Sequence, residues 1–402
     1  MKNLAFLLVL PLFFGGADGM LPPDSPDIMA IVKANNRFAL NLYRFYGEKY
    51  KDDNIFFSPF SISSAFLILY EGTRGKTAEE IRNVFGFPAR ADVRREGYLS
   101  LYEEINKPGK KYELSLANAL WVQKDYRFLK QYLSLVERYY RGKATNLDFR
   151  GDPEGSRKII NKWVEEKTKE KIKDLLPQGS INPLTRMVIT NAIYFKGLWI
   201  FPFDKKKTTD ADFKVSPEKV VKVKMMSLPR PQRFNYAETS DLQILEMPYE
   251  GDELSMLVLL PRENSLEKLE KELSPENLSK WREMLQSREV VVYFPKLKIV
   301  RKYGMVEDLR KMGMPSAFDP AKADLSGLTG KKDLFVTAVY HQAYVDINEE
   351  GTEAAAATGI VVGRTAVEKR IIFRADHPFI FLIQDRRNGN ILFIGRVYNP
   401  SK

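Results

Sequence analysis

The chain carries few of the residues that usually do chemistry. None of its 402 residues is cysteine, and its two histidines are His341 and His377. The lack of cysteine excludes thiolate nucleophiles and thiolate metal sites. A Ser–His–Asp hydrolase could use one of the histidines, but the chain has no Gly-x-Ser-x-Gly elbow, and it also lacks HExxH and P-loop motifs. These absences predict a protein that is not an enzyme and needs no metal or cofactor.

Residues 348–370, NEEGTEAAAATGIVVGRTAVEKR, have a pattern that suits a change of backbone structure rather than catalysis. Alternate residues from Thr352 to Val362 are small or β-branched and uncharged, whereas the other alternate set begins with Glu353. In a strand, the first set would share one face and could be buried. No proline interrupts residues 351–363, so a full ladder of backbone hydrogen bonds could form. The pattern favours a segment that can become a strand inside a sheet, and an alanine-rich helix starting near Thr352 is the alternative.

The first 19 residues are typical of a secretory signal peptide. Lys2 precedes an apolar run that contains Pro11, and residues 17–19 offer small side chains for cleavage. The run is too short to span a bilayer, and a buried N-terminal helix is the alternative. We therefore expect a secreted protein whose mature chain, residues 20–402, is a single domain held together by its core without disulfides.

Helices are predicted mainly in the first half of the chain and strands in the second. Ser25 is expected to cap one helix, Thr77 and Glu80 form a capping box for another, and an amphipathic helix is expected to end at Pro177. Two hairpins are predicted in the second half, one with Asn-Gly at residues 388–389. Because no linker or repeat interrupts this order, it favours one α+β domain.

Six sequence blocks make the chain resemble the serpin family over essentially all of residues 25–400. The blocks are NIFFSPFSISSAFLILYEGTRGKTAEEI (54–81), ITNAIYFKGLWIFPF (189–203), EMPYEGDELSMLVLLP (246–261), DLSGLTG (324–330), INEEGTEAAAATG (347–359) and DHPFIFLI with ILFIGRV. The resemblance implies three β-sheets, eight or nine helices and an exposed reactive centre loop, about residues 349–374, in a metastable state. Most members are suicide inhibitors of serine proteases, and others carry hormones or chaperone collagen.

In an inhibitory serpin a protease cuts this loop and is trapped as an acyl-enzyme when the freed end inserts into the central sheet. An uncharged, proline-free inserting face favours inhibition here, and a ligand carrier or chaperone is the alternative. The predicted reactive bond joins Arg364 and Thr365, because a long cation fits the acidic pocket of trypsin-like proteases. Counting from the hinge places the bond one residue later, and a valine or threonine bait beside a solvated Arg364 is the other alternative. By the resemblance, the hinge of the loop comprises Glu349, Gly351, Thr352, Glu353, Ala354, Ala355, Ala356, Ala357 and Thr358.

The resemblance also implies three groups of supporting residues around the central sheet. They are a shutter of Ser58, Ser61, Asn191 and His341, a breach at Trp199 where the loop first enters, and an ion pair between Lys296 and Glu349 at the loop base. None of these groups is expected to be catalytic. A buried histidine such as His341 is usually a satisfied core residue, and here that interpretation and the shutter coincide.

A net charge of +11 favours an anionic partner. For a secreted protein we expect heparin or another sulfated glycan, a possible accelerator of inhibition, rather than nucleic acid or a membrane; a merely soluble basic surface is the alternative. By resemblance to heparin-binding relatives, the candidate glycan-binding residues are Arg90, Arg94, Arg95, Lys107, Lys110 and Lys111. Lys369 and Arg370 are expected to form basic contacts with the protease outside its active site.

The expected partner is a trypsin-like serine protease of clotting, fibrinolysis or inflammation, held in a covalent 1:1 complex by a monomeric inhibitor. The chain is also similar to the salivary serpins of blood-feeding arthropods, especially ticks, and to arginine-specific members of the family. Asn277, in an Asn-Leu-Ser sequon, is the predicted glycosylation site and is expected in a loop between helices.

Overall fold

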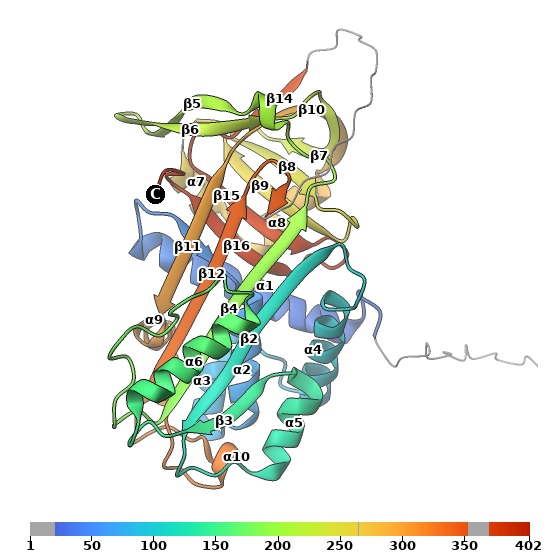
Figure 1. Cartoon of the computed structure of the whole chain (residues 1–402). Coiled ribbons are helices and arrows are strands. Elements are labelled where there is room, and N and C mark those ends of the chain that lie inside the picture. Colours follow the sequence, from blue (N-terminus) through green and yellow to red (C-terminus); the bar gives the residue numbers. More distant parts are fainter. Residues whose placement is uncertain (1–20, 264, 353–369) are drawn as a thin grey trace, which may run out of the picture.

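The computed structural model describes residues 21–263, 265–352 and 370–402 (Figure 1). The helices are α1 (Pro26–Lys49), α2 (Pro59–Glu71), α3 (Gly75–Phe85), α4 (Ala91–Ile105), α5 (Lys130–Tyr140), α6 (Pro153–Lys167), α7 (Leu266–Glu272), α8 (Pro275–Glu283), α9 (Val306–Lys311) and α10 (Ser326–Thr329), with 3-10 turns η1 (Lys205–Lys207) and η2 (Pro315–Phe318). The α+β class predicted from the sequence is confirmed.

A six-stranded sheet extends along much of the long axis of the molecule, and β5, β6, β10 and β14 lie beyond one of its ends (Figure 1). Its strands, in spatial order, are β11 (Leu297–Gly304), β12 (Ala338–Ile347), β13 (Gly351–Thr352), β4 (Met187–Leu198), β2 (Tyr112–Gln123) and β3 (Lys143–Leu147). Strands β12 and β4 are parallel and pair directly through seven residue pairs, from Ala338 with Val188 to Tyr344 with Tyr194. Beyond that point the two-residue strand β13 lies between them.

The second sheet has ten strands. They are β1 (Ile55–Phe57), β5 (Thr209–Ser216), β6 (Lys219–Ser227), β7 (Gln232–Glu238), β8 (Leu242–Pro248), β9 (Leu254–Pro261), β10 (Gln286–Pro295), β14 (Ile371–Arg374), β15 (Phe379–Asp385) and β16 (Ile391–Val397). Because β10 pairs with β7 through one half and with β6 through the other, hydrogen bonding is continuous where three separate sheets were expected in total. The described residues form ten α-helices, whereas eight or nine were expected. The count includes two short helices, α9 with six residues and α10 with four.

The six-stranded sheet is covered on both faces by different cores. Figure 1 shows α6 lying across one face, where Ile160 and Val164 pack with Trp121 in the smaller core. Helix α2 covers the other face; it also contacts β16, and so joins the two sheets. The sheet is therefore buried on both sides, and a new strand would have to fit between packed layers.

Most predicted boundaries agree with the structure, and two do not. Ser25 accepts a hydrogen bond from the Ile28 N–H at the start of α1, and both predicted hairpins are present as β8–β9 and β15–β16. The capping box is wrong, because α3 begins two residues before Thr77, at Gly75. Helix α6 ends at Lys167, well before Pro177.

No helix among the described residues combines the length and apolar character that a bilayer-crossing segment needs. Those residues also contain no cluster of three or more His, Asp or Glu side chains that could hold a metal ion.

Candidate functional site

The hinge begins as a strand that is already inside the six-stranded sheet. Thr352 pairs with Gly197 of β4 on one side and with Ile347 of β12 on the other. Its side chain is fully buried, and its hydroxyl lies 2.8 Å from the Tyr249 hydroxyl. Gly351 is required at this point, because a Cβ there would lie 2.1 Å from the Gly197 carbonyl oxygen. The last two residues that the structure describes at this end of the loop, Gly351 and Thr352, are therefore inserted between β4 and β12.

Trp199 holds the turn that leads into β13. Its ring is buried and stacks on Tyr249 with 4.5 Å between centroids. Its Nε1–H donates to the Asn348 carbonyl at 3.1 Å, and its backbone N–H donates to the Glu350 carbonyl at 2.9 Å. The structure thus places Trp199 where the loop enters the sheet, as the resemblance described in the sequence analysis implied.

The predicted ion pair at the loop base is present. Lys296 Nζ lies 3.0 Å from Glu349 Oε2, and the Thr208 hydroxyl donates to Oε1 at 2.8 Å. Burial opposes ionisation of Glu349, but hydrogen bonds from its own backbone, Lys296 and Thr208 outweigh it and hold its pKa below the usual value. The neighbouring Glu350 pairs with Lys205. Both acidic residues before β13 are therefore anchored.

The four shutter residues meet in one hydrogen-bonded network beneath β4 and β12. The Ser58 N–H donates to His341 Nε2 at 3.1 Å, and the other ring nitrogen of His341 contacts Asn191 Oδ1. Asn191 Nδ2 donates to the Ser61 hydroxyl at 2.6 Å. His341 and Asn191 are also direct neighbours in the β12–β4 register. The network therefore ties together β4 and β12, the two strands between which β13 lies.

Burial keeps His341 neutral within this network. It is fully buried, which lowers its pKa to about 3, although a hydrogen bond involving Asn191 acts in the opposite direction. With Nε2 accepting from Ser58, Nδ1 carries the proton and donates to Asn191. The network holds no charge at neutral pH, so it binds the strands by hydrogen bonds alone.

Sequence reasoning missed one member of the network, Asn118. This β2 residue is the register neighbour of Asn191, and its Oδ1 accepts from Ser61 Oγ at 3.1 Å and from Asn191 Nδ2. The signal was a polar side chain in the otherwise apolar stretch ANALWV. With Asn118 the polar row crosses three strands.

Several predicted residues lie outside the described part of the chain. These are the predicted signal peptide (residues 1–19), the reactive-bond residues Arg364 and Thr365, the predicted protease contact Lys369, and the hinge residues Glu353, Ala354, Ala355, Ala356, Ala357 and Thr358.

The predicted glycan-binding cations do not form one free basic surface. Arg94 is 5% exposed, and both Arg94 and Arg95 form ion pairs with the buried carboxylate of Glu71. These contacts join α4 to α2 and leave little of Arg94 for a ligand. Arg90 pairs with Asp92, and Lys110 pairs with Glu104 and Glu253. Of the six, Lys107 and Lys111 are exposed with no ion pair found in the described structure.

The sequon asparagine lies in a helix rather than in a loop. Asn277 is the third residue of α8, and its Nδ2, the atom that would carry a glycan, donates to the Glu272 carbonyl at 2.7 Å. Glycosylation would require this bond to open.

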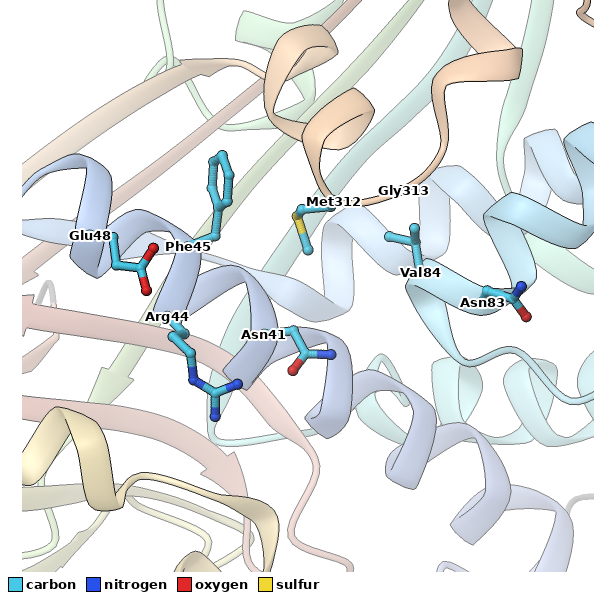
Figure 2. A pocket seen from close by; sticks show the side chains of 8 residues that line it. All are labelled: Asn41, Arg44, Phe45, Glu48, Asn83, Val84, Met312 and Gly313. Carbon is cyan, nitrogen blue, oxygen red and sulfur yellow. The ribbon is translucent and has the colours of Figure 1, made fainter.

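A separate hollow of about 430 Å³ lies on the surface between α1, α3 and the turn after α9 (Figure 2). Phe45, Val84 and Met312 supply apolar walls, and Arg44 and Glu48 project from α1. None of the hinge, shutter or breach residues lines it.

Comparison with known proteins identifies this architecture. The family described as Serpin (serine protease inhibitor) matches residues 33–400. An uncharacterized serpin-like protein of Methanosarcina acetivorans is 43% identical over 94% of this chain and 88% of its own length. The leukocyte elastase inhibitor of Equus caballus is 42% identical over 91% of this chain and 98% of its own. The structure of human thyroxine-binding globulin in complex with thyroxine matches with a TM-score of 0.85 and 33% identity over 94% of this chain and all of that one. The chain belongs to the serpin family.

Proposed function

We propose that this serpin is a secreted suicide inhibitor of trypsin-like serine proteases, and that it acts as bait and trap rather than as a catalyst. One observation carries the proposal: Gly351 and Thr352 already occupy the slot between β4 and β12. The residues that follow have no proline and an uncharged alternate set, so they can continue the same strand.

The register of β13 defines where each inserting residue would go. Thr352 faces Gly197 and Ile347, so continuing the antiparallel pairing places Ala354 between Phe195 and Val345. The side chains of Phe195 and Val345 are buried, as is that of Thr352. The alternate set that begins at Thr352 would therefore face the core, where small side chains displace the least packing.

The same register brings Thr358 level with both Asn191 and His341. These two residues bond to each other in the described structure, so insertion would break the shutter at this point and put the Thr358 hydroxyl in its place. Arg364 is the twelfth residue after Thr352, so at ~3.3 Å per residue a protease acylated at Arg364 would be carried roughly 40 Å. Displacement of this size would distort its oxyanion hole and stall deacylation.

Incubation with trypsin tests the inhibitory mechanism. The expected product is a 1:1 complex that survives SDS, together with a cleaved form that melts at a higher temperature than the intact protein. Cleavage without a complex, and without a rise in melting temperature, would contradict it.

For the reactive bond we propose Arg364 and Thr365. Among the relatives are proteins named leukocyte elastase inhibitor, and elastases have a small specificity pocket. A valine or threonine bait is therefore the competing assignment. Mass spectrometry of the released C-terminal peptide separates them: a peptide beginning at Thr365 supports arginine specificity, and one beginning at Ala366 or at a residue before Thr365 overturns it.

Binding of heparin is a further part of the proposal, supported by the net charge of +11. On the described surface the α4 region would contribute Lys107 and Lys111. Elution from heparin resin tests it: a K107E/K111E variant should elute at lower salt, and an unchanged position would exclude this region.

A ligand carrier is the second candidate, because the matching thyroxine-binding globulin structure contains thyroxine. The hollow of Figure 2 offers apolar walls beside a cation. A protein that is cut by trypsin without forming a complex would favour this candidate.

A further inference from the structure

The outer face of β14, at the C-terminal end of the predicted reactive loop, presents an apolar side chain to solvent. Ile372 is 55% exposed, whereas Ile371 and Phe373 on the opposite face pack against the core. The strand holds Ile372 in place, since it pairs with Val291 of β10 and its carbonyl accepts from Gln243 Nε2 at 3.1 Å. Ile372 is thus a fixed, exposed side chain on β14, a strand that lies at one end of the molecule (Figure 1).

A guanidinium group lies beside Ile372 on the same face. Arg374 follows two residues later, and its guanidinium carbon lies 4.7 Å from the centre of the Tyr293 ring. Asp376 is 3.3 Å from the same guanidinium and neutralises part of its charge. Stacking on the ring pre-orders the arginine, so little side-chain entropy is lost when it meets a partner.

A second guanidinium lies across the sheet on β7. Arg233 is exposed, and its Nε donates to the Ser287 hydroxyl at 3.3 Å. Glu289, an acidic residue of β10, is the cross-strand neighbour of Arg233. Arg370, which immediately precedes β14, is exposed as well. Among the described residues, the three cations Arg233, Arg370 and Arg374 are therefore accompanied by two carboxylates, those of Glu289 and Asp376.

The position of the predicted bait brings a protease to this face. Arg364 and Arg370 are six residues apart, so they can be separated by no more than about 20 Å. A protein domain of about 200 residues is roughly 40 Å across. A protease bound at Arg364 therefore has the β14 face within its own diameter.

We propose that Ile372, with Arg233 and Arg374, forms a second contact surface for the target protease and contributes to the choice between trypsin-like enzymes. The surface fits a protease that carries an apolar side chain surrounded by carboxylates beside its active-site cleft. This inference rests on the proposed inhibitory function.

The test compares Ile372→Asp with the matched control Leu184→Asp. Leu184 is 74% exposed and precedes β4, at the end of that strand remote from β13. Second-order rate constants are measured with trypsin, thrombin, factor Xa and plasmin, together with the stoichiometry of inhibition. Melting temperature and gel filtration establish that each variant is folded and monomeric, and Ile372→Ser replaces Ile372→Asp if the aspartate variant misfolds.

We expect Ile372→Asp to slow the fastest of the four reactions about tenfold, equivalent to about 1.4 kcal/mol, with unchanged stoichiometry because loop insertion is not affected. Leu184→Asp should change the rate less than twofold. Arg233→Glu should slow the same reaction and weaken its dependence on salt between about 0.05 and 0.5 M NaCl. If the parent traps proteases and Ile372→Asp reacts with all four as fast as the parent does, the proposed contact surface is refuted while the proposed function stands. A parent that traps none of the four proteases refutes the proposed function itself.

Discussion

If this serpin inhibits proteases as proposed, replacing Thr352 with arginine should turn it into a substrate. The slot that holds Thr352 is fully buried, and the tyrosine hydroxyl of Tyr249 is the polar side chain that contacts it. An unpaired guanidinium forced into such a place costs several kcal/mol. A cost of about 4 kcal/mol slows insertion by roughly 10³, so deacylation should overtake it and release active protease.

The intact Thr352→Arg protein should still fold, because the arginine can leave the slot with the loop. Thr352→Ser is the matched control: it keeps the hydroxyl and loses one methyl group, worth about 0.8 kcal/mol or a fourfold change in rate. The assay is titration of trypsin activity combined with SDS electrophoresis. The stoichiometry of inhibition should rise from near 1 for the parent and the serine variant to more than about 10 for the arginine variant.

Heat denaturation of the trypsin-cut proteins adds an independent measure. The cut parent should gain stability from the inserted strand, whereas cut Thr352→Arg should melt close to its intact form. A Thr352→Arg variant that traps trypsin at the parental yield would refute the insertion register derived from β13.

Three further predictions concern the residues around the slot. Folding lowers the pKa of His341 from 6.5 to about 3, so as the pH falls the unfolded chain takes up a proton on this histidine before the folded protein does. The stability that the neutral, buried His341 contributes is therefore complete above pH 6.5 and falls by up to about 5 kcal/mol toward pH 3. Urea unfolding of the parent should show this loss, and His341→Gln should lack it. Lys296→Ala should lower the free energy of unfolding by about 1 kcal/mol, a value reduced because the lysine is half exposed, and Glu349→Gln should have a similar effect measured by thermal melting. Trp199→Phe removes the bond to the Asn348 carbonyl, worth about 1 kcal/mol, and should speed hydrogen exchange of the backbone around residues 348–352.

Each of these has an outcome that contradicts it. A His341→Gln protein with the same acid profile as the parent would place the pH dependence elsewhere. A Lys296→Ala variant that melts like the parent, or unchanged exchange in Trp199→Phe, would show that these contacts do not hold the turn before β13.

The capping-box prediction failed because both of its side chains form hydrogen bonds with residues that are distant in the chain. Thr77 and Glu80 have the spacing of a capping box, yet the Thr77 hydroxyl accepts from the Asp324 N–H at 3.0 Å and Glu80 accepts from Ser316 at 2.8 Å. Both side chains join α3 to distant segments instead of capping it. Spacing along the chain cannot reveal partners more than two hundred residues away.

The early end of α6 has a similar cause. Val164 and Glu165 carbonyls accept from Thr168, and Lys169 then takes a positive φ of 51° that ends the helix. Ile172, although in helical register, is instead fully buried in the smaller core. Burial of such apolar side chains against the sheet outweighs the helical hydrogen bonds that the amphipathic pattern predicted.

The sequence alone predicted the fold class, because that depends on the order of helix and strand patterns along the chain. The resemblance carried by its ordered blocks predicted the shutter residues, the breach tryptophan and Gly351 where two backbones meet, and the structure places these residues together. The hinge beyond Thr352 stays a prediction. Only the tertiary structure decided that Thr352 is already inserted, that Asn118 joins the shutter, and that Arg94 and Arg95 serve a buried Glu71 rather than a glycan. The reason is physical. Pairing register, burial and the choice of ion-pair partner arise from segments far apart in the chain, and they take definite values only when those segments pack together.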